Sequence, residues 1–335
     1  MGRKLEANIF EYSRATKIIS ASKAKLNVNL DGYTILTELG TNSYIYSPII
    51  PLLCGASKVL AFVKDSSYGS AENIKAFCIQ IASILGLNHK LQIATNDFPE
   101  HWWREADIVT NSGMLRPFDR EKISKFKKGA VLPLMFEAWE VREQDLDLVA
   151  CRDYGISVAG TWENHPSIKV FDYVKILCLK LAMEAGYEVM GNAIFIWSDD
   201  HFGGMIEDSF ILNGAKKCFL STDLKLLIKV ASDLDFIFIA DYDEKRDYEL
   251  LLDLKNLVVL SPNIGIVHLY GMINIERLKR LGLKVYPETN GKAELMTYTL
   301  AHVGMTPLIN LQVGGYRVAQ EMLKGEYTNI SQPII

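Results

Sequence analysis

Three groups of polar residues in the first half of the chain carry side chains suited to proton transfer and ion pairing. Each group follows an apolar, β-rich run, and the groups are Asn111, Ser112 and Arg116, then Glu137, Glu140 and Arg142, then Glu163 and His165. Glutamate and histidine can move a proton near neutral pH, and arginine holds a carboxylate through two parallel hydrogen bonds. We expect Glu137 and His165 to be catalytic and the remaining residues to bind a small-molecule substrate. A solvated Glu–Arg surface cluster is the alternative.

A second candidate site is the segment FIWSDDHFGG, residues 195–204, which stands where a nucleotide-binding fold places its phosphate loop. At the glycine positions of the dinucleotide fingerprint the chain has Ser198, Asp200 and Gly203. Aspartate beside phosphate costs binding energy, whereas Gly203 and Gly204 preserve close packing of helix on strand. We expect NAD or NADP at Ser198, Asp200, Gly203, Gly204, Thr222 and Asn263. The alternatives are a decayed cofactor site, or carboxylates that bind a hydroxyl-rich or cationic ligand.

A similar loop, TELGTNSYIYSP, follows the first expected strand. Together with Asp65, which follows the second strand, its residues 40–43 are candidates for holding a nucleoside or phosphate. Glycine, serine and aspartate are also ordinary turn residues, so a structural role is the alternative. His268 is a further candidate for moving a proton, because its pKa as a free side chain lies near neutrality.

These residues require strands and helices that bring them together. After a helix near residues 6–22, strands alternate with helices, which is typical of a parallel sheet covered by helices. The expected strands are 33–38, 58–63, 90–94, 107–110, 130–135, 156–159, 193–197, 217–220, 236–240, 257–260 and 284–286. The pattern predicts an α/β fold of two Rossmann-like parallel-sheet domains, 1–166 and 187–310, joined by a long interdomain helix over 167–186. A last helix over 311–325 is free to pack on either domain, and the polar loops are expected to meet in a crevice facing the second domain.

Composition excludes several classes of protein. The chain has 335 residues, is 49% hydrophobic and carries a net charge of −4, so we expect no nucleic-acid partner. It has no apolar run of about 18 residues and no signal-peptide pattern, which predicts a cytoplasmic protein with no membrane partner. Five cysteines without CxxC spacing predict reduced core thiols, and the absence of metal-ligand spacing predicts no metal.

The segment from residue 106 to 186 resembles the core of NAD-dependent D-2-hydroxyacid dehydrogenases of the formate/glycerate dehydrogenase superfamily. The matching residues are Asp145, Asp147-Leu148, Ala150-Cys151 and Gly155-Ile156-Ser157-Val158, followed by the interdomain helix. The resemblance implies that His302, in a His-x-Gly context, is the acid–base histidine, and a packed or capping histidine at a helix end is the alternative. The family's substrate-clamping Arg-Gly pair is absent from SPNIGIVHLYG, and Glu288 and Glu294 are weak matches for the glutamate that tunes the histidine.

We therefore expect an oxidoreductase-like enzyme that acts on a small carboxylated metabolite with a nicotinamide cofactor. The alternative is a non-redox enzyme or ligand-binding protein that keeps the dehydrogenase fold and has lost NAD binding, because both the glycine fingerprint and the arginine clamp are missing. A homodimer is the ordinary expectation for such folds.

Overall fold

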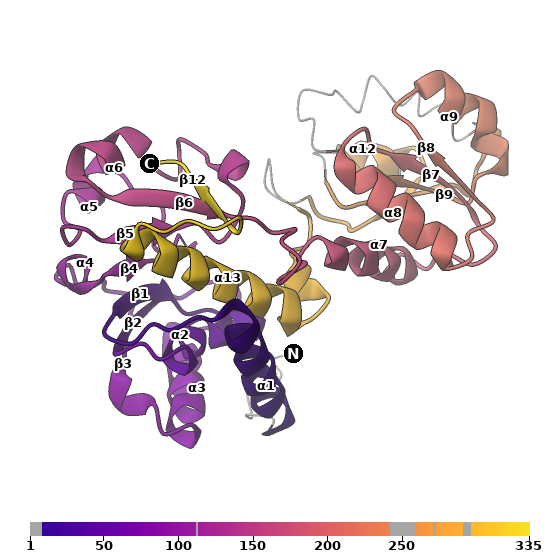
Figure 1. The fold of residues 1–335 in the computed structure, drawn as a ribbon. Helices are drawn as coiled ribbons and strands as arrows, with labels where there is room; N and C mark the ends of the chain where they lie inside the picture. The colour runs from indigo at the N-terminus through magenta and orange to yellow at the C-terminus, as the bar shows by residue number, and fades with distance from the viewer. Residues whose placement is uncertain (1–8, 112, 242–256, 258, 271–272, 291–295) are drawn as a thin grey trace. The chain divides into compact units, whose positions relative to one another are not determined.

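The computed structural model describes residues 9–111, 113–241, 257, 259–270, 273–290 and 296–335 (Figure 1). The chain divides into two compact units. Unit 1 comprises Met1–Val170 and Gly304–Ile335, and unit 2 comprises Phe171–Val303. Each unit is an α/β structure built on one sheet. The helix over residues 305–324 therefore belongs to unit 1, although it follows unit 2 in the sequence.

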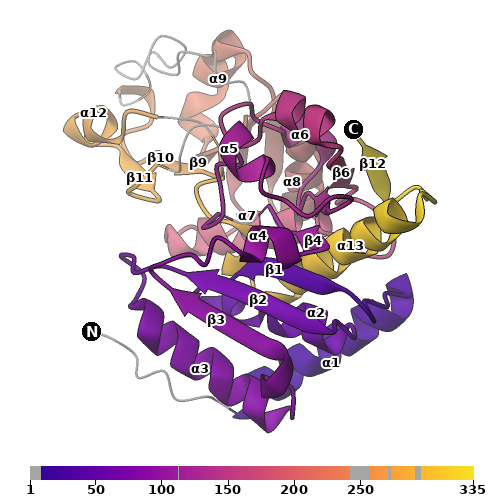
Figure 2. The same ribbon diagram turned by 90° about the vertical axis from the view of Figure 1, so that its left-hand side faces the viewer.

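Unit 1 contains a seven-stranded sheet in the order β12-β6-β5-β4-β1-β2-β3 (Figure 2). The strands are β1 (Thr34–Glu38), β2 (Lys58–Val63), β3 (Leu91–Thr95), β4 (Ile108–Val109), β5 (Val131–Pro133), β6 (Ser157–Thr161) and β12 (Ser331–Pro333). Strands β1 to β6 are parallel, and β12 joins the edge antiparallel to β6. The strand order reverses between β1 and β4, and ligands of open α/β sheets bind at the carboxyl side of such a switch point.

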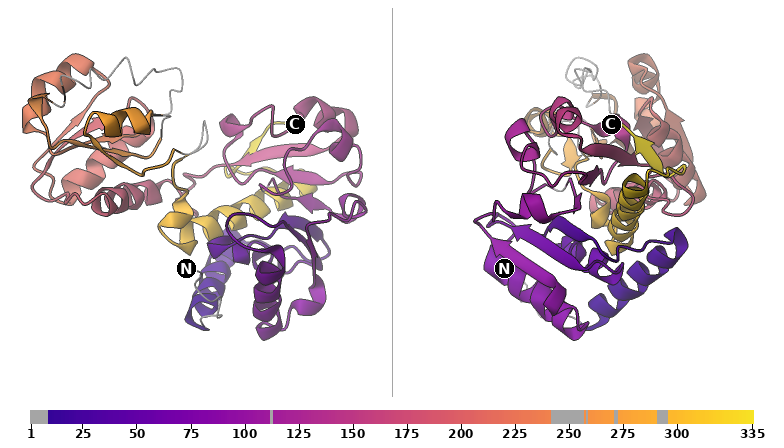
Figure 3. Two further views of the ribbon diagram at one scale, coloured as in Figure 1. Left: turned by 180° about the vertical axis from the view of Figure 1, so that it is seen from behind. Right: turned by 60° about the vertical axis from the view of Figure 1, so that its left-hand side comes forward.

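Helices cover both faces of this sheet. The helices α1 (Ile9–Leu26), α2 (Ile49–Leu53), α3 (Ala71–Ile84) and α13 (Met305–Lys324) lie on one face, and α4 (Trp102–Glu105), α5 (Arg120–Ile123) and α6 (Leu148–Tyr154) lie on the other (Figures 2 and 3). Local sequence explains several of their ends. Ser70, Asp119 and Asp147 cap the starts of α3, α5 and α6 through side-chain acceptors, and Gly155 ends α6 in the left-handed conformation that favours glycine.

The helix α13 is tied to the edge strand β12 by the buried carboxylate of Glu321, which is 2% exposed. Its Oε1 accepts hydrogen bonds from Arg317 Nε at 2.8 Å and Thr328 Oγ1 at 2.6 Å, and its Oε2 accepts from Thr328 N at 2.9 Å and Ser331 Oγ at 2.6 Å. Burial raises the pKa of Glu321, but these hydrogen bonds outweigh it and the net shift is downward. The carboxylate therefore stabilises the fold above its unfolded pKa, and this contribution is lost as the pH falls.

Replacing Glu321 with alanine is expected to lower the free energy of unfolding by about 3 kcal/mol, because it leaves buried donors and a cation without their acceptor. Denaturant unfolding at neutral pH measures the change. Glu326→Ala is the matched control, since Glu326 is exposed. Equal stability of the two variants would contradict the assigned role of Glu321.

Unit 2 contains a five-stranded parallel sheet in the order β11-β10-β9-β7-β8. The strands are β7 (Ala193–Trp197), β8 (Lys217–Leu220), β9 (Phe236–Ile239), β10 (Gly265–His268) and β11 (Lys284–Tyr286). The helices α7 (Asp172–Glu184) and α8 (His201–Leu212) pack in one core, and α9 (Leu224–Val230) and α12 (Ile275–Arg280) pack in the other. The strand order reverses between β7 and β9, so the candidate ligand position lies at the carboxyl ends of these two strands.

The strands expected from sequence are confirmed to within two residues in all cases but one. The prediction of a strand over 257–260 is wrong, because residues 257, 259 and 260 are helical and the strand lies at Gly265–His268. A short apolar run fits a buried strand and a buried helical turn equally well, and here Leu257 packs into the second core as part of a helix. The edge strand β12 was not expected from the sequence.

Candidate functional site

Three glutamates gather at the carboxyl edge of the unit 1 sheet, and we call Glu137, Glu140 and Glu163 the glutamate cluster. Glu137 immediately precedes the short 3₁₀ turn Ala138–Glu140 that follows β5, Glu140 is the last residue of that turn, and Glu163 follows β6. Glu137 is 7% exposed and Glu163 is 8% exposed. The sequence placed these residues after neighbouring strands, and the structure brings them together.

Backbone hydrogen bonds fix the positions of these carboxylates. Glu137 Oε1 accepts a hydrogen bond from the backbone N–H of Glu163 at 3.0 Å. Glu140 Oε1 accepts a hydrogen bond from the backbone N–H of Glu137 at 3.2 Å. Glu137 Oε2 accepts hydrogen bonds from Trp139 Nε1 at 3.0 Å and from Nε2 of Gln332, a residue of β12, at 3.4 Å. The loops after β5 and β6 are therefore joined through Glu137.

Gly160 allows these two loops to approach so closely. A Cβ at this position would overlap the backbone nitrogen of Ala138 and lie 2.9 Å from its Cα. The 3₁₀ turn that carries Glu137 and Glu140 thus rests directly on the backbone of β6. Neither Gly160 nor Gln332 was singled out in the sequence, because their partners lie far away along the chain.

The electrostatics of the cluster are unfavourable to three negative charges. Burial, and to a lesser extent the charge of Glu137, raises the pKa of Glu140 to about 7, although the hydrogen bond from Glu137 N–H and the charge of Arg142 oppose the shift. Burial, followed by the charges of Glu140 and Glu137, raises the pKa of Glu163 well above its ordinary value. Among the described residues, the Glu163 carboxyl group has no hydrogen-bond partner. Carboxyl groups that hold protons near neutral pH are typical of acid–base sites.

A raised folded-state pKa means that the folded chain binds the proton more tightly than the unfolded chain. The destabilisation from Glu140 therefore grows as the pH rises from its ordinary pKa of 4.5 to about 7 and is constant above that range. Glu140→Gln is expected to become more stable than the native chain across this window, by about 1–3 kcal/mol above it. Denaturant unfolding over this range of pH tests it, with exposed Glu143→Gln as control. A stability difference that does not change with pH would contradict the prediction.

A second polar group lies at the switch point of unit 1. Glu38 ends β1, and its Oε2 accepts the backbone N–H of Met114 at 2.8 Å. Burial raises the pKa of Glu38, against the opposing effects of this hydrogen bond and of Arg116. Arg116 is itself held by Asp145, at 2.7 Å, and Asn111 Oδ1 accepts the backbone N–H of Met135 at 2.8 Å. Sequence reasoning did not select Glu38, although an acid at the end of a first strand was an available signal.

Two other residues predicted in unit 1, His165 and Asp65, have structural partners. His165 Nε2 lies 3.1 Å from Asn329 Oδ1, and its Nδ1 accepts the backbone N–H of Ser167 at 3.1 Å. Asp65 accepts the N–H of Ala71, the first residue of α3. Ser112 lies outside the described residues.

In unit 2, Asp200 occupies the start of α8 at the end of the loop that follows β7. Its Oδ1 accepts the backbone N–H groups of Phe202 at 2.8 Å and Gly203 at 3.3 Å, and the hydroxyl of Ser198 at 3.1 Å. A Cβ on Gly203 would lie 2.8 Å from Ser198 Oγ and from Leu220 Cδ1, whereas one on Gly204 would meet no atom within 4 Å. Gly203 therefore allows close packing of helix on strand, and Asp200 accepts hydrogen bonds from the helix N-terminus.

The other positions expected near a cofactor are less distinctive. Thr222 lies between β8 and α9, and Asn263 is exposed in a turn before β10. Asp241 is buried and follows β9, the neighbour of β7. An acid thus follows both strands of the switch point in unit 2.

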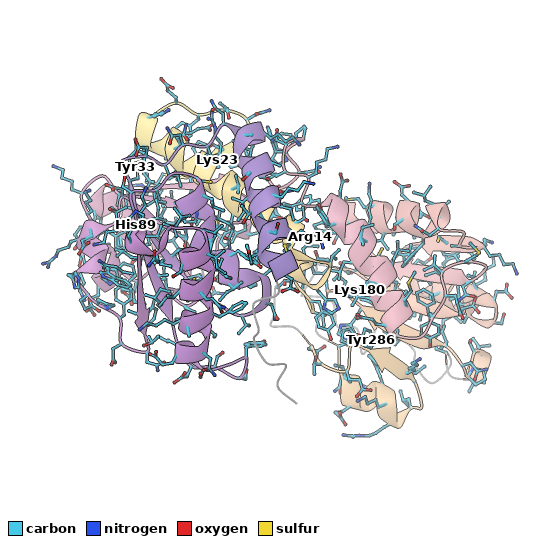
Figure 4. All side chains as sticks on the ribbon, turned by 90° about the horizontal axis from the view of Figure 1, so that it is seen from below. Arg14, Lys23, Tyr33, His89, Lys180 and Tyr286 are labelled. Carbon is cyan, nitrogen blue, oxygen red and sulfur yellow. The ribbon has the colours of Figure 1, made fainter. Side chains whose placement is uncertain are left out.

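His302 forms a pair with Glu184, the last residue of α7. His302 Nε2 lies 3.0 Å from Glu184 Oε2, which also accepts the hydroxyl of Tyr286 at 2.7 Å. Lys180, beside Tyr286 in Figure 4, donates to the carbonyl oxygen of His302 at 2.6 Å. Burial raises the pKa of Glu184, but the hydrogen bonds from His302 and Tyr286 outweigh it and the net shift is downward. Among the described residues, Glu184 rather than Glu288 is therefore the glutamate beside this histidine, and Glu294 lies outside them.

The His302–Glu184 pair does not lie with the polar loops of unit 2. Just after α7, Gly186 contacts Lys284 and Tyr187 contacts Gly265, and these are the first residues of β11 and β10. The end of α7 is therefore near the amino ends of the strands, opposite Asp200. His268 is fully buried, with Pro287 O at 2.9 Å from Nε2 and Thr297 Oγ1 at 3.2 Å from Nδ1, and burial lowers its pKa.

Several solved structures resemble the chain. One chain of dipicolinate synthase from Bacillus halodurans matches with a TM-score of 0.53 and 10% identity, over 88% of this chain and 98% of that one. A putative D-3-phosphoglycerate dehydrogenase from Ralstonia solanacearum matches with a TM-score of 0.50 and 9% identity, over 89% of this chain and 96% of that one. The pyruvate reductase of Chlamydomonas reinhardtii matches with a TM-score of 0.50 and 9% identity, over 82% of this chain and 98% of that one. No protein-family model and no curated protein sequence matches the chain.

The chain has the two-domain fold of the D-2-hydroxyacid dehydrogenases. The resemblance seen around residues 106–186 is thus confirmed at the level of the fold. The strand that precedes the expected arginine clamp is β10, and the residues after it, LYGMIN, again contain no arginine. A similarity at these identities does not extend to substrate or cofactor.

The dehydrogenase fold implies a nicotinamide dinucleotide. Its pyrophosphate accepts hydrogen bonds from backbone N–H groups at the start of the helix that follows the first strand of the dinucleotide-binding domain. In this chain that helix is α8, and the Asp200 carboxylate already accepts the N–H groups of Phe202 and Gly203. A pyrophosphate there would displace a capping carboxylate and meet its negative charge. The residues at this position therefore do not fit a dinucleotide bound in the usual way.

Other expectations concern metals, membranes and cysteines. Within the described ranges, no group of three or more histidine, cysteine, aspartate or glutamate residues is arranged to hold a metal ion. None of the described helices combines the length and the hydropathy needed to cross a membrane. All five cysteines are free thiols, and burial raises the pKa of Cys54 and Cys78 to about 12.

Proposed function

We propose that the chain is a non-redox enzyme or ligand-binding protein of the dehydrogenase fold, whose working site is the glutamate cluster of unit 1. The observation that carries this proposal is the gathering of three glutamates at the carboxyl edge of one sheet, two of them buried, where desolvation and, after it, the charges of their neighbours raise the pKa values of Glu140 and Glu163. Proteins retain such destabilising groups mainly at sites of binding or catalysis. Glu140 holds its proton near neutral pH and therefore suits both donation and acceptance of a proton.

In this proposal each residue has a distinct role. Glu140 exchanges a proton with the bound molecule, and Glu163 offers it a carboxyl group that no protein donor among the described residues already occupies. Glu137 positions Glu140 and Glu163. Its carboxylate accepts hydrogen bonds from the backbone N–H of Glu163 and from the side chains of Trp139 and Gln332. No step requires electron transfer.

A thermal-shift screen of the full chain tests the site with three sets of small molecules: amines, polyols and carboxylic acids. We expect compounds that stabilise the native chain near neutral pH and lose this effect in Glu163→Gln, while Glu143→Gln behaves like the native chain. The absence of any compound with this dependence on Glu163 would refute the proposed site.

A nicotinamide-dependent oxidoreductase acting on a small carboxylated metabolite is the second candidate. Two observations favour it: the switch point beside β7, and Gly203, which matches the fingerprint glycine that lets the helix pack close to the strand. Calorimetry with NAD(H) and NADP(H) separates the candidates. Our first proposal expects no binding by the native chain at about 1 mM dinucleotide, a concentration far above the usual affinity range of specific sites. Binding would favour the second candidate. A homodimer stays a prediction for both.

A further inference from the structure

We propose that the glutamate cluster and the indole of Trp139 bind a small organic ammonium ion. The inference rests on the proposed function, because it names the class of ligand for the same site. Three features of unit 1 carry it: an unpaired buried carboxyl group, an exposed aromatic ring held against the cluster, and the excess of acidic over basic groups there.

The first feature is Glu163. The residue is 8% exposed, yet its carboxyl group has no hydrogen-bond donor among the described residues. The charges of Glu140 and Glu137 help to raise its pKa, so the three carboxyl groups lie within electrostatic range of one another. A buried polar group without a partner is costly, and a ligand that donates hydrogen bonds or carries positive charge removes this cost.

The second feature is Trp139, which is 56% exposed although it is a large aromatic residue. Its Nε1 donates to Glu137 Oε2 at 3.0 Å, so the edge of the indole is held against the cluster. Aromatic faces attract cations, and tryptophan does so most strongly. An exposed indole beside carboxylates is therefore suited to bind an alkylammonium group.

The third feature is charge. Glu137, Glu140 and Glu163 supply three carboxyl groups to the cluster, and the positive charge of Arg142 opposes the rise in the pKa of Glu140. An anionic ligand would add repulsion to this group, whereas a cation relieves it. A metal ion is a poorer fit than an organic cation, because no suitable group of metal ligands exists in the part of the chain that the structure describes. The observations therefore favour an ammonium over a carboxylate or a metal.

Choline and 3,3-dimethylbutan-1-ol are suitable probes, because they have the same shape and differ in charge. Calorimetry on the full chain at about pH 8, where Glu140 is mostly ionised, is expected to show choline binding and at least about tenfold weaker binding of the neutral alcohol. Glu163→Gln and Trp139→Leu are each expected to weaken choline binding by about tenfold, a change typical of losing one such contact. Exposed Glu143→Gln is the control and leaves it unchanged.

The pH dependence provides an independent readout, because the charge of choline does not titrate. Bound cation favours ionised Glu140, so binding releases a proton and affinity rises with pH. Between about pH 6 and pH 7 the affinity should rise by up to about tenfold. Glu140→Gln should remove this dependence. The groups that face the titrating pair are Glu137 and Arg142 on the same loop and Glu163 on the next.

Failure of this inference differs from failure of the proposed function. Equal binding of choline and the alcohol, or no choline binding, overturns the ammonium assignment. If a polyol or carboxylic acid from the thermal-shift screen then still depends on Glu163, the proposed site stands with another class of ligand. If no compound depends on Glu163, both fall.

Discussion

Asp200→Gly is expected to bring NAD(H) binding into the measurable range, and Ser198→Gly with Asp200→Gly is expected to strengthen it further. In the native chain the Asp200 carboxylate accepts the N–H groups of Phe202 and Gly203, which a pyrophosphate needs. Glycine frees both groups, opens space for the phosphate and removes one negative charge. The repulsion that disappears amounts to a few kcal/mol in a partly buried site, or about tenfold to hundredfold in affinity.

Asp200→Asn is the matched control, because asparagine keeps a capping oxygen and removes the charge. Its affinity should lie between those of the native chain and Asp200→Gly, and the glycine variant should also lose about 1 kcal/mol or less of stability with the cap. Calorimetry with NAD(H) and denaturant unfolding measure the two effects. Tight binding by the native chain that weakens in Asp200→Gly would make Asp200 a ligand contact. Absence of binding in every variant would leave unit 2 without a dinucleotide site.

Gly160→Ala is expected to lower the free energy of unfolding by about 2–4 kcal/mol, because an added methyl group would overlap backbone that cannot move independently. The nearest atoms belong to Ala138, between Glu137 and Glu140. The substitution should therefore also displace these carboxylates and weaken any ligand that depends on Glu163. Denaturant unfolding and the thermal-shift screen measure the two consequences.

Gly204→Ala serves as the control for adding a methyl group. A Cβ there meets no atom within 4 Å, and the position lies inside α8. Alanine should stabilise this helix by up to about 1 kcal/mol. If Gly160→Ala were as stable as the native chain and kept its ligand response, the close approach of the two loops would not support the site.

The switch points of the two units share an acidic carboxyl edge. In unit 1 the acids Glu38 and Glu163 lie at this edge, and in unit 2 Asp200 and Asp241 follow neighbouring strands. Dinucleotide-binding folds of this kind use such an edge for an anionic group, the pyrophosphate of the cofactor. This chain has carboxylates at these edges, which repel an anionic ligand and attract a cationic one, and both proposals rest on that charge.

The sequence alone determined the local structure of the protein and the nature of its polar loops. Alternating strand and helix patterns predicted every described strand except β10 and β12, because burial on a regular element repeats with the period of that element. The departure of residues 198–203 from the dinucleotide fingerprint could also be recognised from the sequence. The positions of the fingerprint, including those where glycine is missing, are neighbours in the chain. The apolar run 257–260 was misread, because a run so short has no period.

The tertiary structure decided which distant residues became partners. Glu184 and His302 are 118 residues apart, and Glu137 and Gln332 are 195 residues apart. No local pattern encodes such pairs, because they depend on where α7 ends, how β12 joins the sheet edge and how closely Gly160 lets two loops approach. The unpaired carboxyl group of Glu163 likewise exists only in the folded chain, where burial removes water and the described neighbouring loops supply no donor.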